Sequence, residues 1–555
     1  MREKYWWIND ESQSMLERGY LVEDQTVEDK LKIICKYAAS FYKDEDDLKE
    51  RFLEIFERGW ASLSSPIWAN FGEERGLPIS CFNTLIPDSM DGIYTSLHEV
   101  AMETKLGGGT SGYFGKLRGL GTPVKGGGIS SGAMSFVELF DSTTKIVSQA
   151  GVRRGAFAAY LEIDHPEIEK FLTVKDKNST LQSINTAVCV SDEWMKSMKE
   201  GDKEKRETWA KVIKSRREKG IPYLFFSDTA NKNKPQIYKD TNSTIYASNL
   251  CNEIYLPTNE FESFVCCLMS MNLATYDEWK DTDAVELAVK FLDAVIGDFI
   301  KKVKSIPSMY KTYNFAVRHR ALGIGVLGWH SLLQQKMIPF ESTDAQRLNT
   351  TIFKDLKEKT YKASIELGEK YGYAPIFDEV DTTDSKRRNT TLIAIAPTTS
   401  SSSILGQVSP SVEPFASNYF VVGLAKGSFT RKNVNLEKLL ESKNRNTDDV
   451  WKNIVQAQGS VQQLEFLSQD EKDVFKTFQE ISPLTVIQQA SARQQFVDQG
   501  QSINLKIPNS MSVKDINKIH MEAWESGLKG LYYQRGTSVA KEAVLNMMEC
   551  KACEA

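Results

Sequence analysis

The sequence has few cysteines, no long apolar run and little net charge, and each scarcity excludes a class of protein. Eight cysteines among 555 residues are too few for a disulfide scaffold. No segment approaches the ~18 apolar residues of a membrane span, and the N-terminus lacks an apolar signal core. A net charge of −5 argues against a dedicated nucleic-acid binder, but not against a local phosphate site. We therefore expect a cytoplasmic protein that binds neither membrane nor nucleic acid, with thiols reduced unless catalysis oxidises them.

The hydrophobic pattern divides the chain into three parts. Residues 1–65 have apolar positions at helical spacing, continuing over 48–63, and predict a small helical domain that ends near Pro66. Residues 66–537 alternate β-rich runs with helical segments, which favours an α/β architecture with mostly parallel strands. Residues 538–555 have no core pattern and predict a flexible tail.

Within the middle part, several segments are predicted individually. The strands expected are 155–163, 186–190, 222–226, 263–273, 391–396, 502–507 and 530–533. Helices are expected over 284–302 and 344–370, and the first has one apolar face that should pack on a sheet. Residues 424–480 are polar and predict a helical surface region.

The segment Asn249-Leu-Cys251-Asn-Glu253 combines an amide, a thiol and a carboxylate at alternate positions. In an extended segment all three side chains point the same way, within reach of one small substrate. Such a group suits sulfur chemistry with acid–base assistance. For an isolated cysteine, a buried thiol with solvated flanks is the commoner alternative.

Two further segments have residues typical of phosphate contact. Residues 105–114 contain three successive glycines, whose N–H groups approach phosphate easily, but no P-loop lysine follows and a plain turn is the better interpretation. Residues 397–403 place a run of hydroxyls directly after the apolar run 392–396. A strand that ends in such a loop at a helix start suits phosphate, and a capping loop or a flexible serine tract explains it equally well.

Two side-chain pairs near the C-terminus suggest redox chemistry. Tyr532 and Tyr533 are adjacent in a predicted strand, where tyrosines usually serve packing. Cys550 and Cys553 have the spacing of a dithiol couple or of half a zinc site. With only five histidines and no second Cys-x-x-Cys, thiol exchange on a tail is the better interpretation.

Taken in order, these segments resemble the large, catalytic subunit of a class I ribonucleotide reductase over about residues 60 to 555. The motifs that support the resemblance are Pro78–Cys81, Ser148–Ala156, Asn249–Glu253, Cys266-Cys267-Leu268, Arg320–Gly325, Pro397–Ser403, Val412-Glu413-Pro414, Asp498–Asn504 and Tyr532-Tyr533. The resemblance implies an α/β barrel of ten strands in two five-stranded parallel halves, with a central finger loop and a small helical domain before it.

The family resemblance also implies a role for each reactive residue. Cys251 at the fingertip would be a transient thiyl radical, Glu253 the base on the 3′ hydroxyl, and Asn249 the group that orients both. Cys81 and Cys266 would supply two reducing equivalents and end as a disulfide. The adjacent Cys267 would point to the other face of its strand.

The same resemblance implies partners, and none of the cofactors would be bound by this chain itself. A metal-containing small subunit would supply the radical through Tyr532 and Tyr533. Thioredoxin or glutaredoxin would reduce Cys550 and Cys553, which in turn reduce the active-site disulfide. The chain would act as a homodimer.

Nucleotide sites follow from the resemblance as well. The substrate, a ribonucleoside diphosphate, would contact the residues Ser64, Ser65, Ser80, Thr398, Thr399, Ser400 and Ser401. Some relatives carry a carboxylate where Thr399 stands. Deoxynucleotide or ATP effectors would bind a specificity site that includes Asp88, Arg118, Gln149, Arg153 and Arg154.

Two other functions are compatible with parts of this sequence. A class II, adenosylcobalamin-dependent reductase normally lacks the tyrosine pair. A regulatory protein without catalysis would not keep all five catalytic and redox cysteines, Cys81, Cys251, Cys266, Cys550 and Cys553. Only about 65 residues precede the first barrel motif. We therefore expect no N-terminal ATP cone on this chain, so any overall-activity control would belong to the partner subunit.

Overall fold

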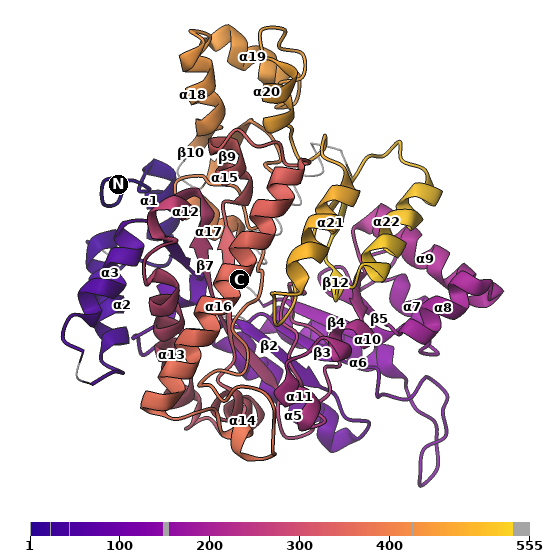
Figure 1. Cartoon of the computed structure of the whole chain (residues 1–555). Helices are drawn as coiled ribbons and strands as arrows, with labels where there is room; N and C mark the ends of the chain where they lie inside the picture. Colours follow the sequence, from indigo (N-terminus) through magenta and orange to yellow (C-terminus); the bar gives the residue numbers. More distant parts are fainter. Residues whose placement is uncertain (1, 23, 44, 148–154, 425–426, 537–555) are drawn as a thin grey trace.

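A barrel of strands surrounded by helices forms the centre of the molecule (Figure 1). The computed structural model describes residues 2–22, 24–43, 45–147, 155–424 and 427–536. Five parallel strands, hydrogen-bonded in sequence order, form the first half of the barrel. They are β2 (Cys81–Leu85), β3 (Thr110–Tyr113), β4 (Phe157–Glu162), β5 (Asn185–Val190) and β6 (Tyr223–Phe226). Almost all of their residues are buried, as expected where helices cover the outside and side chains fill the inside.

The second half of the barrel also has five segments with parallel neighbours, but some of them meet only at single bridges. In order around the ring they are β7 (Phe264–Asn272), β8 (Leu322–Leu327), a segment bridged through Ile393 and Ile395, a segment from Gln501 to β11 (Leu505–Ile507), and β12 (Gly530–Leu531) continuing into β13 (Gln534–Gly536).

Antiparallel contacts close the ring at both seams between the halves. β2 pairs with β7 in the register Cys81↔Cys266, and β6 pairs with β12 in the register Phe225↔Gly530. Two parallel five-stranded halves joined in this way are the predicted ten-stranded α/β barrel, which is therefore confirmed.

The predicted strands agree best where the strands are long. The predictions 155–163, 186–190, 222–226 and 263–273 coincide with β4, β5, β6 and β7. The predicted strand 391–396 is not a continuous strand and forms only two isolated β-bridges, at Ile393 and Ile395. The predicted strand 530–533 ends as a regular strand before the tyrosine pair. There the Tyr532 N–H donates to the Ile503 carbonyl and the Tyr533 carbonyl accepts from the Leu505 N–H, so the pair bonds to the segment at β11 instead of to β6.

The long helices outside the barrel begin and end close to the predicted bounds. α13 (Ala284–Val303) and α16 (Thr343–Tyr371) pack on each other, and the predicted apolar face of α13 is buried except for the half-buried Ile300. No helix in the described residues combines the length and apolarity that crossing a membrane requires. The other helices around the barrel are α4 (Ser65–Asn70), α5 (Met90–Lys105), α6 (Ala133–Ile146), α7 (Ile168–Leu172), α8 (Asp192–Glu200), α9 (Lys203–Lys219), α10 (Ser227–Lys232), α11 (Gln236–Asp240), α12 (Tyr276–Trp279), α14 (Tyr310–His319), α15 (Trp329–Gln335), α17 (Thr399–Ile404), α21 (Pro483–Gln494) and α22 (Val513–Glu525).

The N-terminal segment is helical but contributes one strand that was not predicted. α1 (Asp10–Glu17), α2 (Val27–Ala39) and α3 (Leu48–Glu57) are helices as expected. The expected helix over 48–63 is wrong at its end, because β1 (Ala61–Leu63) pairs antiparallel with β7. Its residues are all buried, so tertiary pairing overrides the local helical pattern. One hydrophobic cluster runs from Trp7 to Leu531 and includes these helices.

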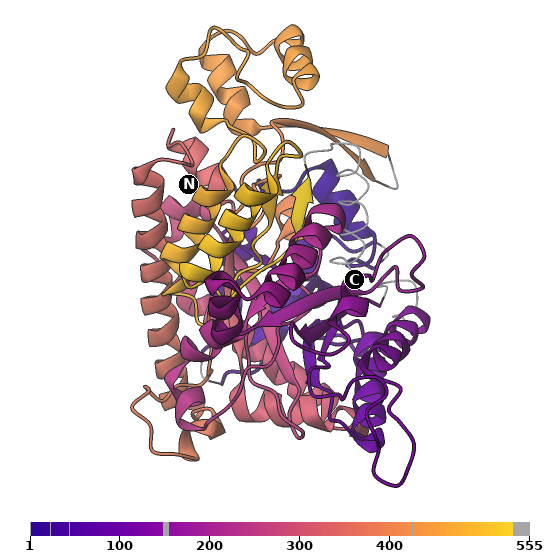
Figure 2. The ribbon, with the colours of Figure 1, turned by 90° about the vertical axis from the view of Figure 1, so that its right-hand side faces the viewer.

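The predicted polar helical region 424–480 is only partly helical. A hairpin of β9 (Tyr419–Leu424) and β10 (Gly427–Lys432) leads into it, so the helical prediction is wrong there. α18 (Val434–Ser442), α19 (Asp448–Gln456) and α20 (Gln469–Val474) follow and enclose a small core of their own around Trp451. Figures 1 and 2 both show these three helices together at one end of the molecule.

Candidate active site

The segment that contains Cys251 enters the barrel as a tight turn. The Asn252 N–H donates to the Asn249 carbonyl at 3.2 Å, and Asn252 has a φ of 63°, a left-handed conformation that asparagine adopts more readily than most residues. The prediction of an extended segment with strict alternation is therefore wrong. Cys251 lies within this finger turn (residues 249–252) and is partly exposed.

The side-chain amide of Asn249 nevertheless lies against the carboxylate of Glu253. Its Nδ2–H donates to Glu253 Oε1 at 3.0 Å. Its Oδ1 accepts from the backbone N–H of Glu253 at 3.0 Å and of Ile254 at 3.1 Å. The Ser502 hydroxyl lies within hydrogen-bond distance of two acceptors, the other carboxylate oxygen of Glu253 at 3.1 Å and the Cys251 carbonyl at 2.5 Å. The Tyr160 hydroxyl donates to the Asn249 carbonyl at 2.7 Å. Hydrogen bonds rather than strand alternation therefore fix this geometry.

The environment of Glu253 suits a group that exchanges protons. Burial raises the pKa of Glu253 to about 7, although the hydrogen bonds from Asn249 and Ser502 lower it. The side chain is 1% exposed. A carboxyl group with a pKa near neutrality is well matched to general-base work at neutral pH.

Three glycines leave room for the finger turn and the residues after it. A Cβ on Gly109 would lie 3.1 Å from Leu250 Cδ2, one on Gly500 would lie 2.2 Å from Tyr255 Cε2, and one on Gly530 would lie 2.3 Å from the Tyr255 hydroxyl. Residues 106–109 form the turn between α5 and β3, which agrees with the prediction of a plain turn, whereas residues 110–113 of the same segment are β3 itself. The close contact of Gly109 with the finger turn was not predicted, because its partner lies far along the chain.

Cys81 and Cys266 lie directly opposite each other on β2 and β7. Opposed residues of an antiparallel pair have Cα atoms ~4.5–5.5 Å apart, which is within the ~4.4–6.8 Å range of disulfides. Cys267 pairs instead with Leu322 of β8. It points to the other face of the strand, where the Asp293 carboxylate of α13 is an electrostatic neighbour.

The two opposed thiols have different surroundings. Burial raises the pKa of Cys81 well above its usual range and the Glu253 carboxylate adds to the rise, while hydrogen bonds from Asn249 and Ser80 lower it. Burial raises the pKa of Cys266 to about 12, while a hydrogen bond from Gln499 lowers it. Each thiol therefore has its own hydrogen-bond donors, and the donor to Cys266 is the fully buried amide of Gln499.

A cavity opens beside the finger turn, and most of the predicted reactive and substrate residues line it. Cys81 belongs to its wall, whereas Cys266 lies behind the wall and is 1% exposed. Ser62, Leu268 and Ser270 also line the cavity and were not predicted. The predicted residues that line it are Ser64, Ser65, Ser80, Cys81, Asn249, Cys251, Glu253, Thr398, Thr399, Ser400 and Ser401.

The cavity wall offers neutral hydrogen-bond donors. α4 and α17 both begin at this wall, at Ser65 and Thr399, so backbone N–H groups without helical acceptors face the same space. Ser400 Oγ is buried and has no hydrogen-bond partner among the described residues. The described residues that line the cavity include no lysine or arginine. An anion bound there would therefore be held by hydroxyl and backbone donors.

Tyr532 and Tyr533 form a compact aromatic group with Tyr223 of β6, a residue not singled out from the sequence. Ring centroids are 4.4 Å apart for Tyr532 and Tyr533, 4.6 Å for Tyr223 and Tyr532, and 4.9 Å for Tyr223 and Tyr533. Tyr223 is fully buried, and Cys251 is among its electrostatic neighbours. The predicted tyrosine pair and the finger cysteine thus share one neighbourhood.

A buried arginine supports the tyrosine group from α9. Arg216 Nη1 donates to the Tyr532 carbonyl at 3.0 Å, and its Nε donates to His520 Nε2 at 2.9 Å. The His520 ring donates from Nδ1 to the Ile516 carbonyl at 2.8 Å, which fixes its tautomer. Burial lowers the pKa of Arg216 to about 9 and that of His520 to about 3. Neutral acceptors therefore hold a buried cation beside Tyr532.

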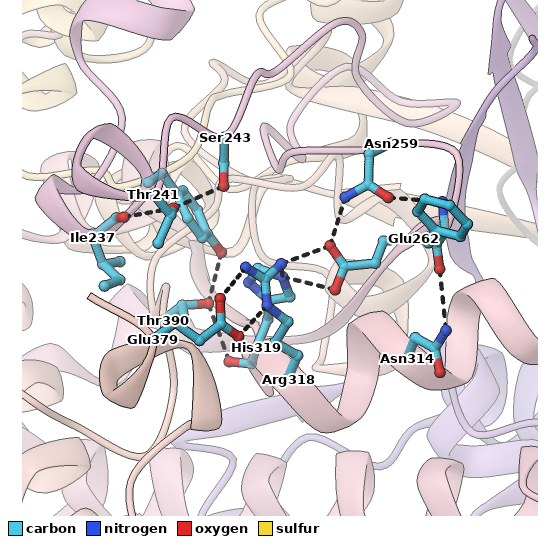
Figure 3. A network of polar contacts seen from close by, with 12 residues as sticks. Ile237, Thr241, Ser243, Asn259, Glu262, Asn314, Arg318, His319, Glu379 and Thr390 are labelled. Atoms are coloured by element: carbon cyan, nitrogen blue, oxygen red, sulfur yellow. Dashed lines mark hydrogen bonds and ion pairs between the residues drawn. The ribbon is translucent and has the colours of Figure 1, made fainter.

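The chain between the finger turn and β7 is fixed by a polar network (Figure 3). Glu262 Oε2 accepts from Arg318 Nη1 at 2.7 Å and from Asn259 Nδ2 at 2.8 Å. Arg318 also donates to both oxygens of Glu379, and Asn314 Nδ2 donates to the Phe261 carbonyl at 3.2 Å. Charge-assisted contacts of this kind resist displacement of the segment.

The predicted effector residues are only partly within the described chain. Arg118 Nε donates to Asp88 Oδ2 at 2.7 Å, and both side chains are about one-third exposed, at 34%. This pair lies apart from the cavity lining. The remaining predicted residues, Gln149, Arg153, Arg154, Cys550 and Cys553, lie outside the described residues.

Comparison with known proteins gives consistent matches. A family model described as "Ribonucleotide reductase, barrel domain" matches residues 79–206, 203–387 and 384–534. The putative ribonucleoside-diphosphate reductase large subunit of Frog virus 3 (isolate Goorha) is 34% identical over 545 residues, which cover 93% of this chain and 94% of the viral protein. The large subunit from Invertebrate iridescent virus 3 is 32% identical, covering 94% of this chain and 93% of its own length.

A solved structure agrees with these matches over almost the whole chain. The class Id ribonucleotide reductase alpha subunit of Actinobacillus ureae superposes with a TM-score of 0.91 and is 47% identical in sequence. The likeness covers 99% of this chain and 100% of that subunit.

Proposed function

This chain belongs to the ribonucleotide reductase family as a large, catalytic subunit, and we propose that it reduces ribonucleoside diphosphates to 2′-deoxyribonucleoside diphosphates in the cavity beside the finger turn. Subunits of this class work with a separate small subunit. The observation that supports the location best is the convergence of Asn249, Cys251, Glu253 and Cys81 on a cavity whose other wall is the hydroxyl-rich start of α17.

The finger turn begins the chemistry. Cys251, as a thiyl radical, takes the hydrogen atom from C3′ of the ribose and becomes a thiol. Glu253, as a carboxylate, takes the proton of the 3′ hydroxyl, and its pKa of about 7 suits that role. Asn249 Nδ2 orients the carboxylate and the substrate together.

Cys81 and Cys266 supply the two electrons. The C2′–O bond breaks, the oxygen leaves as water, and an S–S bond forms between the two sulfurs as their two hydrogens are consumed. Cys251 then returns a hydrogen atom to C3′ and is again a thiyl radical. The opposed register of Cys81 and Cys266 supports this pairing.

Regeneration and radical supply involve the C-terminal region. Cys550 and Cys553 reduce the Cys81–Cys266 disulfide by thiol exchange, and thioredoxin or glutaredoxin reduces them in turn. Tyr532 and Tyr533 pass the electron and proton between Cys251 and the small subunit, which holds the metal-containing radical source. The aromatic contacts of 4.4 Å between the two rings support a relay.

Nucleotide binding completes the proposal. The diphosphate of the substrate contacts Thr398, Thr399, Ser400 and Ser401, with Ser64, Ser65 and Ser80 around the remainder of the substrate. The partnerless Ser400 hydroxyl and the two helix starts support an anion there. Effector nucleotides bind near Asp88 and Arg118, and Gln149, Arg153 and Arg154 relay specificity across a homodimer in the cytoplasm.

Turnover with purified components tests the proposal directly. Full-length chain is mixed with a ribonucleoside diphosphate and a dithiol, with and without its small subunit, and deoxynucleotide is measured. We expect product only when the small subunit is present, and none from a Cys251→Ser chain. Product from the chain with adenosylcobalamin and no partner would indicate a class II enzyme instead, and reduction by Cys251→Ser would refute the mechanism.

A further inference from the structure

Gln499 places an amide N–H group on the sulfur of Cys266. The Nε2 atom lies 3.4 Å from Cys266 Sγ, and the side chain is fully buried. The same nitrogen donates to the Leu322 carbonyl at 2.9 Å and lies 3.2 Å from Thr391 Oγ1. One N–H is therefore committed to the carbonyl, and the other is available to the thiol or the threonine.

The orientation of this amide is fixed by its other contacts. Gln499 Oε1 accepts from the Tyr255 N–H at 3.3 Å, and a reversed amide would turn NH₂ toward that donor and oxygen toward the Leu322 carbonyl. The backbone is held too, because the Gln499 N–H donates to the Ile393 carbonyl at 3.2 Å and the Gln499 carbonyl accepts from Gln494 at 3.1 Å. These contacts require that the nitrogen of the Gln499 amide, and not its oxygen, faces the sulfur of Cys266.

The space around Cys266 is closely fitted. A Cβ on Gly323 would lie 3.3 Å from Cys266 Sγ and 2.9 Å from the Ala394 Cβ, so the glycine leaves just enough room for the sulfur. A thiolate formed in such a site loses its hydration, and an N–H donor offsets part of that cost. The hydrogen bond from Gln499 accordingly lowers the pKa of Cys266 against the larger effect of burial.

Access to the two sulfurs differs. Cys81 lines the cavity and is half-buried, whereas Cys266 lies behind the wall and is 1% exposed. The Glu253 carboxylate disfavours negative charge on both sulfurs, so access and the Gln499 donor distinguish the two, not Glu253. In thiol–disulfide exchange one sulfur is attacked and the other departs as a thiolate, and a departing thiolate that is better stabilised leaves faster.

We propose that the Cys81–Cys266 disulfide is opened by attack on Cys81, and that Gln499 is a further catalytic residue that stabilises Cys266 as the departing thiolate. This inference rests on the redox pair proposed above. An incoming thiolate forms an S–S bond to Cys81, the Cys81–Cys266 bond breaks, and its electron pair stays on Cys266, which then takes a proton. A second thiol releases Cys81 and closes the disulfide of the reductant.

The site of attack can be identified in otherwise unaltered chain. Full-length protein with Cys550 and Cys553 replaced by serine is oxidised with diamide, treated briefly with 2-mercaptoethanol, quenched with N-ethylmaleimide and mapped by peptide mass spectrometry. We expect the mercaptoethanol adduct on Cys81 and the maleimide on Cys266. An adduct mainly on Cys266 would overturn the inference while leaving the redox pair intact. If no Cys81–Cys266 disulfide forms, the redox pair and the inference both fail.

The role of Gln499 is tested by removing its donor. Gln499→Met keeps the volume and removes the amide, and Gln501→Met does the same at a buried amide two residues away that bonds Ala490 and Gln494 instead. We expect Gln499→Met to slow reduction of the disulfide by dithiothreitol about tenfold and to raise the pH midpoint of Cys266 alkylation in a Cys81→Ser background. Gln501→Met should leave both unchanged. Equal rates and midpoints in wild type and Gln499→Met would overturn the assignment.

Discussion

Cys81 and Cys266 face each other across one of the two antiparallel seams that join the parallel halves of the barrel. Within each half the neighbouring contacts are parallel and follow the order of the sequence. This seam instead brings β2, the first strand of one half, beside β7, the first strand of the other. Two thiols far apart in the sequence therefore become direct neighbours without any distortion of the sheet.

Mild oxidation should join these two thiols selectively. We expect diamide to remove two free thiols from the folded chain in a Cys550→Ser, Cys553→Ser background, and peptide mapping to find Cys81 linked to Cys266. Cys267→Ser is the matched control, because the Cys267 side chain points to the opposite face of β7 from that of Cys266. It should oxidise normally and retain turnover. A Cys267→Ser chain without turnover beside an active Cys266→Ser chain would reverse the choice between the two residues.

The rate of deoxynucleotide formation should rise with pH through about 7. Glu253 must be a carboxylate to take a proton, and burial raises its pKa to about 7. Ser502→Ala removes a hydrogen bond that favours the charged form. We expect it to move the acid limb of the pH–rate profile upward by about one unit. Ser491→Ala removes a half-buried hydroxyl that bonds the Ser526 carbonyl, and should leave the limb in place.

The same pKa shift has the opposite sign for stability. Between the usual glutamate pKa of 4.5 and the folded value of about 7, the folded chain holds a proton on Glu253 that the unfolded chain releases. The contribution of Glu253 to the free energy of unfolding therefore falls as pH rises through that window. Glu253→Gln should flatten this part of the stability curve in urea titrations at several pH values, and a curve as steep as that of wild type would contradict the shift.

The sequence predicted the long helices and strands better than the two antiparallel pairings that close the barrel. Apolar runs such as 263–273 and helical spacing such as 284–302 depend on local pattern, and they appear as β7 and α13. The strand β1 was missed because its pairing with β7 is decided by tertiary contact. The hairpin of β9 and β10 was missed because the polar composition around it favours helix or surface. The seams depend on contacts between distant segments, which no local pattern contains.

The candidate site was predictable where residue chemistry is distinctive and ordered along the chain. Cys81, Asn249, Cys251 and Glu253 meet at the cavity as the family resemblance implied. The extended geometry argued from alternation was wrong, because Asn252 adopts a left-handed conformation. Gln499 lies within the motif 498–504, but the sequence implied no role for it. A buried glutamine has no local signature, and only the packing of the segment against β7 gives it a sulfur to bind.

Gly530→Ala should disturb the finger turn without removing any reactive group. The added Cβ would lie 2.3 Å from the Tyr255 hydroxyl, 2.5 Å from the Leu224 carbonyl and 2.9 Å from Asn252 Nδ2. The Leu224 carbonyl belongs to the backbone and the Tyr255 side chain is fully buried, so neither can move cheaply. We therefore expect a loss of about 1–3 kcal/mol in the free energy of unfolding, measured in urea. We also expect turnover to fall by more than the unfolded fraction explains.

Gly372→Ala provides the comparison for Gly530→Ala. Gly372 has a φ of 92° and no atom within 4 Å of an added Cβ. Its ψ is 144°, so a side chain there should cost only backbone strain, about 1–3 kcal/mol, and leave turnover unchanged. Equal effects of the two substitutions on turnover would mean that the finger turn tolerates the displaced contact.

Tyr223 should matter through its ring rather than its hydroxyl. Its ring packs on Tyr532 and Tyr533 at centroid distances of 4.6 and 4.9 Å and is fully buried. Tyr223→Phe keeps that packing, so we expect turnover with the small subunit within about threefold of wild type, whereas Tyr223→Ala should cost about 3–5 kcal/mol of stability and most of the turnover. Tyr532→Phe keeps the ring too but removes the group proposed to be oxidised, so it should bind substrate normally and form no product. Substrate affinity and product formation are measured separately on each chain. A Tyr223→Phe chain that binds substrate but forms no product would mean that the Tyr223 hydroxyl takes part in the relay itself.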